Sequence, residues 1–231
     1  MLSNDRRPYP SQHRQPSSDD ASSRNPAPTP RTSQHYEEYL KRYELLLEFK
    51  HMKSPQNCPP GIYLKPSLDN LYEWFGTFFL HRGYYKEGVF QFSIQIPPTY
   101  PAHPPTVRFL TDMFHPLVAR DGEFNISPGF PEWRPRKDHI ANILHYMRNA
   151  FRESVLTTLE DHSCWNVDAL RIFRTERLLF AKLAAQCGQL SVSEGILFDD
   201  SEASAIRFSP MSDAHFEEVR AQMLGSQNLN I

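Results

Sequence analysis

Tyr100-Pro-Ala-His-Pro-Pro-Thr-Val-Arg-Phe109 begins the stretch of sequence that decides the fold. The stretch continues with Phe114-His-Pro-Leu117, Asp121-Gly-Glu-Phe-Asn-Ile126 and Trp133-Arg-Pro135. Proline fixes φ, so the first segment is expected to be a rigid crossing into the next strand. A single His or a proline-rich loop is a weak signal. The joint spacing of the His-Pro pair, Gly122 and Trp133 is much more specific.

This spacing resembles the central signature of the ubiquitin-conjugating (UBC) fold. In active members a His-Pro-Asn turn precedes a Gly-x-x-Cys segment, and a Trp-Ser-Pro follows. Here His115 and Pro116 match the turn, Leu117 stands at the position of the Asn, and Asn125 stands at the position of the cysteine. The resemblance implies that His115 braces the loop and that Trp133 packs the active-site flap against the domain.

The two replacements predict a loss of chemistry. Ubiquitin transfer passes through a thioester and needs a thiolate nucleophile, whereas an Asn amide has no ionisable nucleophilic atom. The Asn of the turn is thought to stabilise an oxyanion, and a donor of that type is typically worth ~10²–10³ in rate. Leu117 has no donor. We therefore expect no enzyme activity from this degenerate site, which comprises His115, Leu117, Asn125 and Trp133.

The cysteines do not restore the nucleophile. Cys58, Cys164 and Cys187 all lie outside the stretch from His115 to Trp133. Their sparse, odd count without a Cys-x-x-Cys pair argues against a zinc site and against a disulfide framework. We expect no metal and no other cofactor. One alternative remains, a weak conjugating enzyme that uses Cys164 as a displaced nucleophile.

Composition indicates one domain with tails. The 231 residues carry a formal net charge of −2, which gives no basic footprint for nucleic acid. No apolar run approaches the roughly 18 residues of a membrane span. The N-terminus lacks the charged-then-apolar pattern of a signal peptide. We expect a cytoplasmic protein that binds no nucleic acid and does not insert directly into membranes.

Three regions are predicted along the chain. Residues 1–33 are rich in Pro and Ser and are expected to be a disordered tail. Residues 34–187 are expected to form the UBC-like core. Residues 188–231 are expected to form a C-terminal extension with a final helix. The core should begin with a helix, because apolar residues recur at helical spacing. They are Tyr36, Tyr39, Leu40, Tyr43 and Leu47, with Glu37, Lys41, Arg42 and Glu48 facing outward.

The order of patterns predicts an α+β fold of the UBC type, with an N-terminal helix, a four-stranded antiparallel meander and C-terminal helices. Strands are expected over 74–80, 90–96 and 107–110, and alternation is clearest in the second. Helical periodicity follows. Asp138 is expected to cap one helix and Asn166 a long one that Gly188 ends. Ser212 or Asp213 should open the last helix.

The sequence is similar to the Fused toes / AKT-interacting protein family from about residue 36 to 224. The matching stretches are Trp74-Phe-Gly76, Arg82-Gly-Tyr84, Gly88-Val-Phe90, Phe114-His-Pro-Leu-Val118, Trp133-Arg134 with His139-Ile140, and Arg207-Phe-Ser-Pro210. The resemblance implies an adaptor that associates with a Hook-type coiled-coil protein and a Hook- and Fused-toes-interacting protein. That complex links vesicles, notably endosomes, to dynein on microtubules, so peripheral association with endosomes or microtubules through these partners is implied.

A second alternative is a ubiquitin-binding or ubiquitin-chain-directing variant, which would bind ubiquitin, possibly weakly, on the outer face of the meander. For the adaptor, the C-terminal third offers a candidate surface, because the connection over 188–212 is long. Its apolar clusters either pack back onto the domain or join the last helix in a face for a partner helix. The candidate binding residues are Ile196, Phe198, Ile206, Phe208, Phe216, Val219 and Met223.

Overall fold

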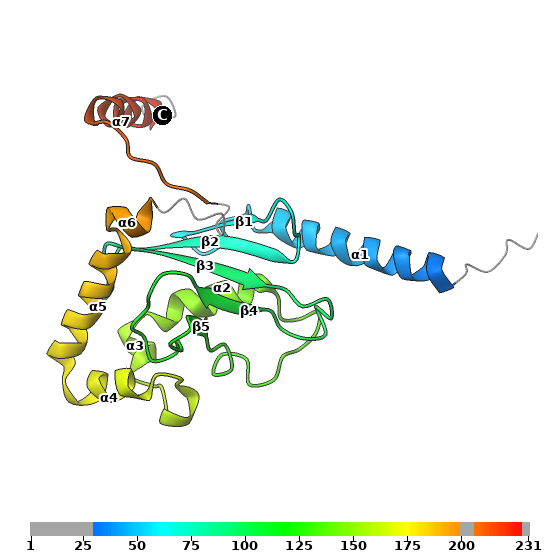
Figure 1. Cartoon of the computed structure of the whole chain (residues 1–231), viewed down its shortest axis with the longest axis horizontal. Coiled ribbons are helices and arrows are strands. Elements are labelled where there is room, and N and C mark those ends of the chain that lie inside the picture. The colour runs from blue at the N-terminus through cyan, green and yellow to red at the C-terminus, as the bar shows by residue number, and fades with distance from the viewer. Residues whose placement is uncertain (1–29, 199–205, 228–231) are drawn as a thin grey trace, which may run out of the picture. The chain divides into compact units, whose positions relative to one another are not determined.

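The computed structural model describes residues 30–198 and 206–227, and it has the α+β architecture that the sequence predicts (Figure 1). The chain divides after Leu40 into two compact units, and the fold described here is that of the second. The strands are β1 (Ile62–Pro66), β2 (Glu73–Leu80), β3 (Gly88–Gln95), β4 (Thr106–Phe109) and β5 (Glu123–Phe124). The helices are α1 (Pro30–His51), α2 (Ile140–Ala150), α3 (Glu153–Leu156), η1 (Asp161–Ser163), α4 (Val167–Thr175), α5 (Arg177–Ser191), α6 (Glu194–Leu197) and α7 (Asp213–Gln227).

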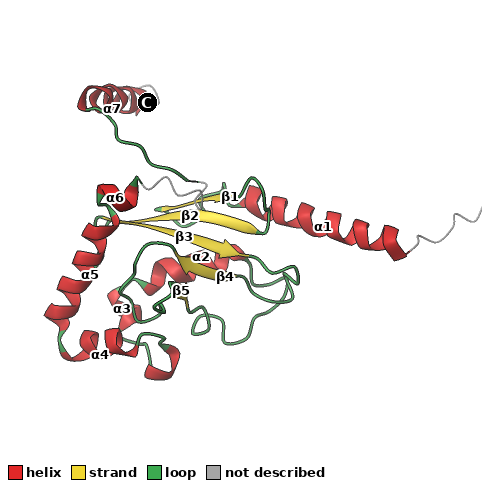
Figure 2. Ribbon diagram, in the orientation of Figure 1, coloured by secondary structure: helices red, strands yellow, loops and turns green. Residues whose placement is uncertain are grey.

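In the described part of the chain the meander has five antiparallel strands in the order β1-β2-β3-β4-β5, one more than predicted (Figure 2). β5 is only two residues long and pairs Phe124 with Val107. β1, which the sequence patterns did not locate, ends in Pro66. Proline cannot donate a ladder hydrogen bond and is therefore confined to edge strands, strand ends and bulges. β1 is an edge strand that pairs only with β2.

The core lies between the sheet and α2, which crosses one face of it (Figure 1). Side chains of β2 and β3 meet the apolar stripe of α2 and are buried there. The residues that form this part of the core are Trp74, Phe90, Phe92, Ile94, Ile143, Leu144 and Met147. Trp133, expected to pack the flap against the domain, is half-buried and packs against the edge of this core.

The predicted apolar face of α1 is wrong in its first part. Tyr36, Tyr39 and Tyr43 are exposed, and in the part of α1 that belongs to the second unit Leu45 is buried instead. Glu48, predicted to face outward, is largely buried, with a side chain 14% exposed. Sequence spacing favoured the tyrosine stripe because these side chains are large and partly apolar. An aromatic ring with a hydroxyl is equally compatible with solvent.

Two predicted helix signals are also corrected. Asp138 does not cap α2. Its carboxylate binds Arg134, and His139 takes the cap position, donating its main-chain N–H to Asn142 Oδ1 at 2.9 Å. Asn166 does cap α4, accepting from the Ala169 N–H at 3.0 Å. The long helix expected from there is two helices, since α4 ends at Thr175 and Glu176, at φ −134° and ψ 63°, separates it from α5.

Gly188 does not stop α5, which continues to Ser191. A Cβ on Gly88 would lie 3.1 Å from the Gly188 Cα, so the two glycines let α5 and β3 pack backbone to backbone. Ser191 completes this contact by accepting the Val89 N–H at 2.9 Å. The core therefore extends past the predicted boundary at residue 187.

The predicted boundary of the N-terminal tail also differs from the structure. α1 begins at Pro30, ahead of the boundary at residue 33, and the first helical turn is a favourable place for proline. Residues 1–29 lie outside the described residues, so disorder there stays a prediction. α7 begins at Asp213, one of the two predicted starts, and the Ser212 carbonyl accepts the Phe216 N–H at 2.9 Å.

Candidate functional site

The predicted site lies on the loops that connect β4, β5 and α2 (Figure 2). Gly122 sets the turn before β5. Its φ is 89°, and a Cβ there would come within 2.2 Å of the Phe109 carbonyl oxygen, so only glycine fits. The Asn125 N–H donates to the Leu117 carbonyl at 2.8 Å. The structure thus brings together the two positions that the sequence singles out.

His115 braces this loop from inside the protein. Its Nδ1 accepts the Leu117 N–H at 3.0 Å, and its Nε2 lies 3.2 Å from the Ala150 carbonyl at the end of α2. Because Nδ1 accepts and a carbonyl can only accept, the proton lies on Nε2 and the ring is neutral. Burial lowers the pKa of His115 to about 4, against the opposing effect of the Ala150 carbonyl. The predicted role as a brace agrees with this geometry.

Leu117 is fully buried and contributes only an apolar side chain. Asn125 is 5% exposed, and both ends of its amide are engaged. Its Oδ1 accepts the Ser127 N–H at 2.9 Å, which closes a local turn, and its Nδ2 donates to the Ser163 carbonyl at 2.9 Å. Asn125 therefore ties the loop after β5 to the segment that precedes α4.

Ser163 is the partner that sequence reasoning missed. It lies 38 residues from Asn125, in η1, and no local pattern links the two. A cavity of about 610 Å³ opens beside them, lined also by Tyr146, His162 and Trp165. The Tyr146 hydroxyl is buried without a hydrogen-bond partner in the described structure. Burial, and next the nearby Cys164, raise the pKa of Tyr146 well above its ordinary value.

The flap is held by two polar contacts. The Trp133 Nε1–H donates to the Pro101 carbonyl at 2.8 Å, which connects the flap to the proline-rich crossing. Arg134 binds the buried Asp138 carboxylate through its main-chain N–H, Nε and Nη2, at 2.8, 3.1 and 2.7 Å. The hydrogen bond from the Arg134 side chain holds the pKa of Asp138 below its usual value. These contacts fix the flap without involving Asn125.

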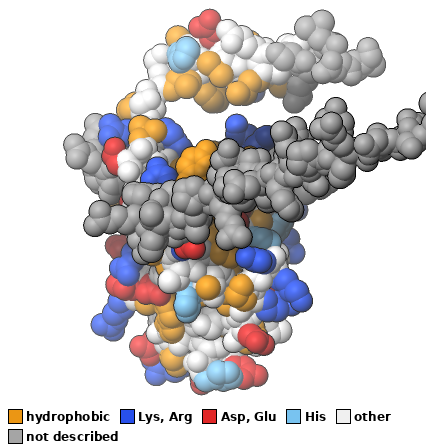
Figure 3. Space-filling model, turned by 90° about the vertical axis from the view of Figure 1, so that its right-hand side faces the viewer, with side chains coloured by type: hydrophobic (Ala, Val, Ile, Leu, Met, Phe, Trp, Pro, Cys, Tyr) orange, Lys and Arg blue, Asp and Glu red, His pale blue; other side chains and the backbone are white. Residues whose placement is uncertain are grey.

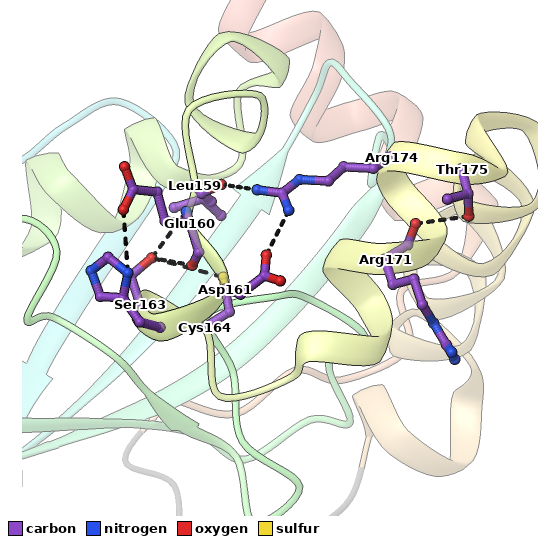
Figure 4. Close-up of polar contacts among 9 residues, drawn as sticks. Leu159, Glu160, Asp161, Ser163, Cys164, Arg171, Arg174 and Thr175 are labelled. Carbon is purple, nitrogen blue, oxygen red and sulfur yellow. Dashed lines mark hydrogen bonds and ion pairs between the residues drawn. The ribbon is translucent and has the colours of Figure 1, made fainter.

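None of the three cysteine thiols is placed to act as an exposed nucleophile, since Cys164 and Cys187 are buried and Cys58 is half-buried. Cys164 is buried beside a network in which Arg174 reaches from α4 to the Asp161 carboxylate and the Leu159 carbonyl, at 2.5 and 2.6 Å (Figure 4). Cys187 is buried and donates to the Asp112 carbonyl, and Cys58 donates to the Ile62 carbonyl. Burial raises the pKa of all three thiols. A raised pKa leaves less thiolate and a weaker nucleophile at neutral pH.

The predicted binding residues fall into two groups. The first lies between α5 and α7 along the chain. Phe198, Ile206 and Phe208 are partly buried there, and the rings of Phe208 and Phe79 meet edge to face with centroids 6.2 Å apart, whereas Ile196 is exposed and lines a cavity beside α5. The second group lies on α7, where Phe216 and Met223 are exposed. Figure 3 shows hydrophobic side chains along one side of this helix, the uppermost segment in the view. The structure does not bring the two groups into one described surface.

Residues 30–198 and 206–227 hold no cluster of three or more His, Cys, Asp or Glu side chains with the geometry to hold a metal ion. Within the same ranges, no helix has both the length and the apolar character that a membrane crossing requires.

Comparison with known proteins shows clear similarities. A family model described as "Ubiquitin-conjugating enzyme" matches residues 44–187. The chain is 32% identical over 209 residues to AKT-interacting protein of Homo sapiens, which covers 87% of this chain and 68% of that protein. It is 34% identical over 159 residues to Protein crossbronx homolog of Anopheles gambiae, covering 65% of this chain and 67% of that protein. With AKT-interacting protein of Danio rerio the identity is 34% over 193 residues, covering 81% and 63%.

Proposed function

Because the chain belongs to the ubiquitin-conjugating-enzyme-like family that includes the AKT-interacting and crossbronx proteins, we propose that it is a non-catalytic adaptor built on that fold. The proposal assigns the position of the catalytic cysteine to Asn125 and the position of the oxyanion-binding Asn to Leu117. One observation carries it. The Asn125 amide is buried, and its Oδ1 and Nδ2 are hydrogen-bonded to the Ser127 N–H and the Ser163 carbonyl, so the residue at this position has a structural role.

The surroundings of Asn125 support the same proposal. Leu117, whose carbonyl accepts the main-chain N–H of Asn125, offers no side-chain donor to a developing oxyanion. His115 is braced between two backbone groups and has no free nitrogen for proton transfer. Cys164, the proposed displaced nucleophile, is buried with a raised pKa, which disfavours the alternative of a weak conjugating enzyme.

With its chemistry gone, such a domain acts through its surface. We assign it to a Hook- and Fused-toes-type complex that links endosomal vesicles to dynein and microtubules, in which a Hook-type coiled coil is its direct partner. This assignment is supported by family resemblance and by the spacing of Phe216, Val219 and Met223 as anchors on one face of α7, where Phe216 and Met223 are exposed and Val219 is partly buried. Helix-in-groove and coiled-coil contacts use this spacing.

A pull-down with a purified Hook-type coiled coil tests the assignment. Phe216→Glu with Met223→Glu in the full chain should abolish capture. Ala214→Glu with Ala221→Glu places the same two charges on α7 at exposed positions offset from the stripe and should leave capture unchanged. Deleting residues 1–29 should also have no effect. Full capture by the double variant, with its fold verified by circular dichroism, would remove α7 from the interface.

A deletion that tests the C-terminal region must begin beyond α5, because the core continues past the predicted boundary at residue 187. A deletion of 189–231 removes Ser191, which accepts the Val89 N–H in the core, so loss of binding would not be interpretable. A deletion of 206–231 leaves α5 and α6 intact and removes Phe208 together with α7. We expect this chain to remain folded and to lose the coiled-coil partner.

The ubiquitin-binding alternative meets an obstacle on the outer face of the meander. Phe79 lies on the strand face opposite Phe78, and the Phe208 ring rests against it. Ubiquitin would therefore compete with the chain's own segment at this point. An NMR titration with ubiquitin discriminates the two functions. Shifts on β2 and β3 that grow in Phe208→Ala would favour ubiquitin binding, and an unchanged spectrum in both chains would exclude it from this face.

A further inference from the structure

A second surface is hollowed and positively charged, and nothing above assigns it a role. A cavity of about 1000 Å³ lies where the end of β2 and the β2–β3 connection meet the end of α2. Its floor is apolar and includes Phe78 and Phe151, both buried and packed edge to face with ring centroids 5.3 Å apart. Neither Asn125 nor any residue of α7 is among the residues that line it.

Three arginines line the cavity: Arg82 from the β2–β3 connection, Arg148 from the last turn of α2, and Arg152 from the residue before α3. None has an ion-pair or hydrogen-bond partner for its guanidinium among the described residues. Other arginines in the described ranges do pair with carboxylates. They are Arg108, Arg134, Arg171, Arg174, Arg177 and Arg220.

The acidic residue at the cavity does not neutralise these arginines. Glu153 is engaged from the other side: Arg177 binds its carboxylate at 2.5 Å, and the Tyr84 hydroxyl donates to the same oxygen at 3.0 Å. With respect to residues 30–198 and 206–227, the cavity therefore presents three arginine charges without a paired carboxylate above an apolar floor.

The arginines stand on a fixed frame. In the β2–β3 connection the Glu87 N–H donates to the Leu80 carbonyl at 2.7 Å, and the Lys86 N–H donates to the Gly83 carbonyl at 3.3 Å. Gly83 has a φ of 86°, which sets this turn. Since Arg148 and Arg152 extend from the α2–α3 segment, little backbone ordering is required on binding, and preorganisation favours affinity.

We propose that this cavity is a docking site for an acidic segment of a partner protein, with carboxylates or phosphates paired to Arg82, Arg148 and Arg152 and an apolar side chain on the Phe78–Phe151 floor. Guanidinium groups match both anions through two parallel hydrogen bonds. An apolar floor under a cationic rim fits a peptide better than a free anion, which has nothing to place there. The site is independent of the proposed coiled-coil contact on α7.

The test is a fluorescence anisotropy titration of the full chain with a labelled peptide in which glutamates flank one phenylalanine. Arg82→Ala, Arg148→Ala and Arg152→Ala combined should weaken binding about tenfold or more, because each variant removes a charged partner from the complex. A matched control removes three exposed cations outside the cavity, Arg120→Ala, Lys137→Ala and Lys182→Ala, and should change affinity by less than about twofold.

Three further arms identify the ligand. A peptide with phosphoserines in place of the glutamates separates phosphate from carboxylate as the preferred anion. A peptide with glutamines in their place should not bind, and binding of this peptide as tightly as the acidic one overturns the proposal. Equal losses in the cavity and control variants also overturn it, since they would mean non-specific attraction. If the chain binds neither anionic peptide but captures vesicles of phosphatidylcholine with a phosphoinositide, the ligand of the cavity is a membrane surface and the peptide proposal is wrong.

Discussion

The carboxylate of Glu48 on α1 accepts a hydrogen bond from the hydroxyl of Tyr100, 2.7 Å away in the loop after β3. Its other oxygen accepts the main-chain N–H of Ile140, the first residue of α2, also at 2.7 Å. One side chain thus satisfies an otherwise orphan donor at a helix start and fixes the proline-rich crossing. Burial, and then the Glu48 charge, raise the pKa of Tyr100 far above its ordinary value, so Tyr100 remains a donor.

We predict that Glu48→Ala lowers the free energy of unfolding by about 2 kcal/mol, because it removes two hydrogen bonds to a charged group and strands the Ile140 N–H. Glu44→Ala, one turn earlier on the same helix and exposed, should change it by less than about 0.5 kcal/mol. Urea denaturation followed by fluorescence measures both. Equal effects at the two positions would mean that Glu48 contributes only helix propensity.

Truncation of core residues should separate the sheet from the flap. Phe92→Ala should cost roughly 3–5 kcal/mol, because Phe92 is fully buried between β2, β4 and the core. Trp133→Ala should cost less, about 1–3 kcal/mol, since Trp133 is half-buried and loses one hydrogen bond. Chemical denaturation of the two variants gives the comparison. A larger loss for Trp133→Ala would place the flap inside the core.

His115 should make stability depend on pH. Its pKa is about 4 in the folded chain, below the ordinary value of about 6.5, so the unfolded chain binds the proton first as pH falls. The contribution of His115 to the free energy of unfolding is fully present above pH 6.5 and decreases as the pH falls towards 4, below which it no longer changes. The loss across this window is about 3 kcal/mol. In His115→Asn, urea denaturation across this window should show a flatter profile. An unchanged slope would assign the acid sensitivity to other groups.

A cysteine introduced at position 125 should not create a conjugating enzyme. In Asn125→Cys we expect little or no reducible ubiquitin adduct on incubation with activating enzyme, ubiquitin and ATP, because Leu117 gives no donor to the oxyanion. The unaltered chain should form none. Non-reducing electrophoresis with and without thiol reductant measures both. A reducible band in the unaltered chain that disappears in Cys164→Ala would establish the displaced nucleophile, and robust charging of Asn125→Cys would contradict our account of the site.

The sequence predicted the parts of the fold whose residues signal locally. β3 is recognisable because its side chains alternate between apolar and polar, and α4 because Asn166 is a typical N-cap residue. The His-Pro spacing located the loop around Asn125. It could not predict features that depend on partners distant in the chain. Glu48 looks solvent-exposed until Tyr100 and Ile140 are placed beside it. Gly188 resembles a helix stop until Gly88 is seen to approach it. The arginine cavity likewise assembles from segments that share no pattern.

The two hydrogen bonds of the Asn125 amide have a consequence for the history of the family. A change back to cysteine at this position would remove the bonds to Ser127 and Ser163 at once, while the gain in chemistry would require a second change at Leu117. The first step of such a reversal therefore loses stability and returns no activity. If the proposed function holds, selection for a folded adaptor is enough to keep the asparagine in place, even without selection against the enzyme activity.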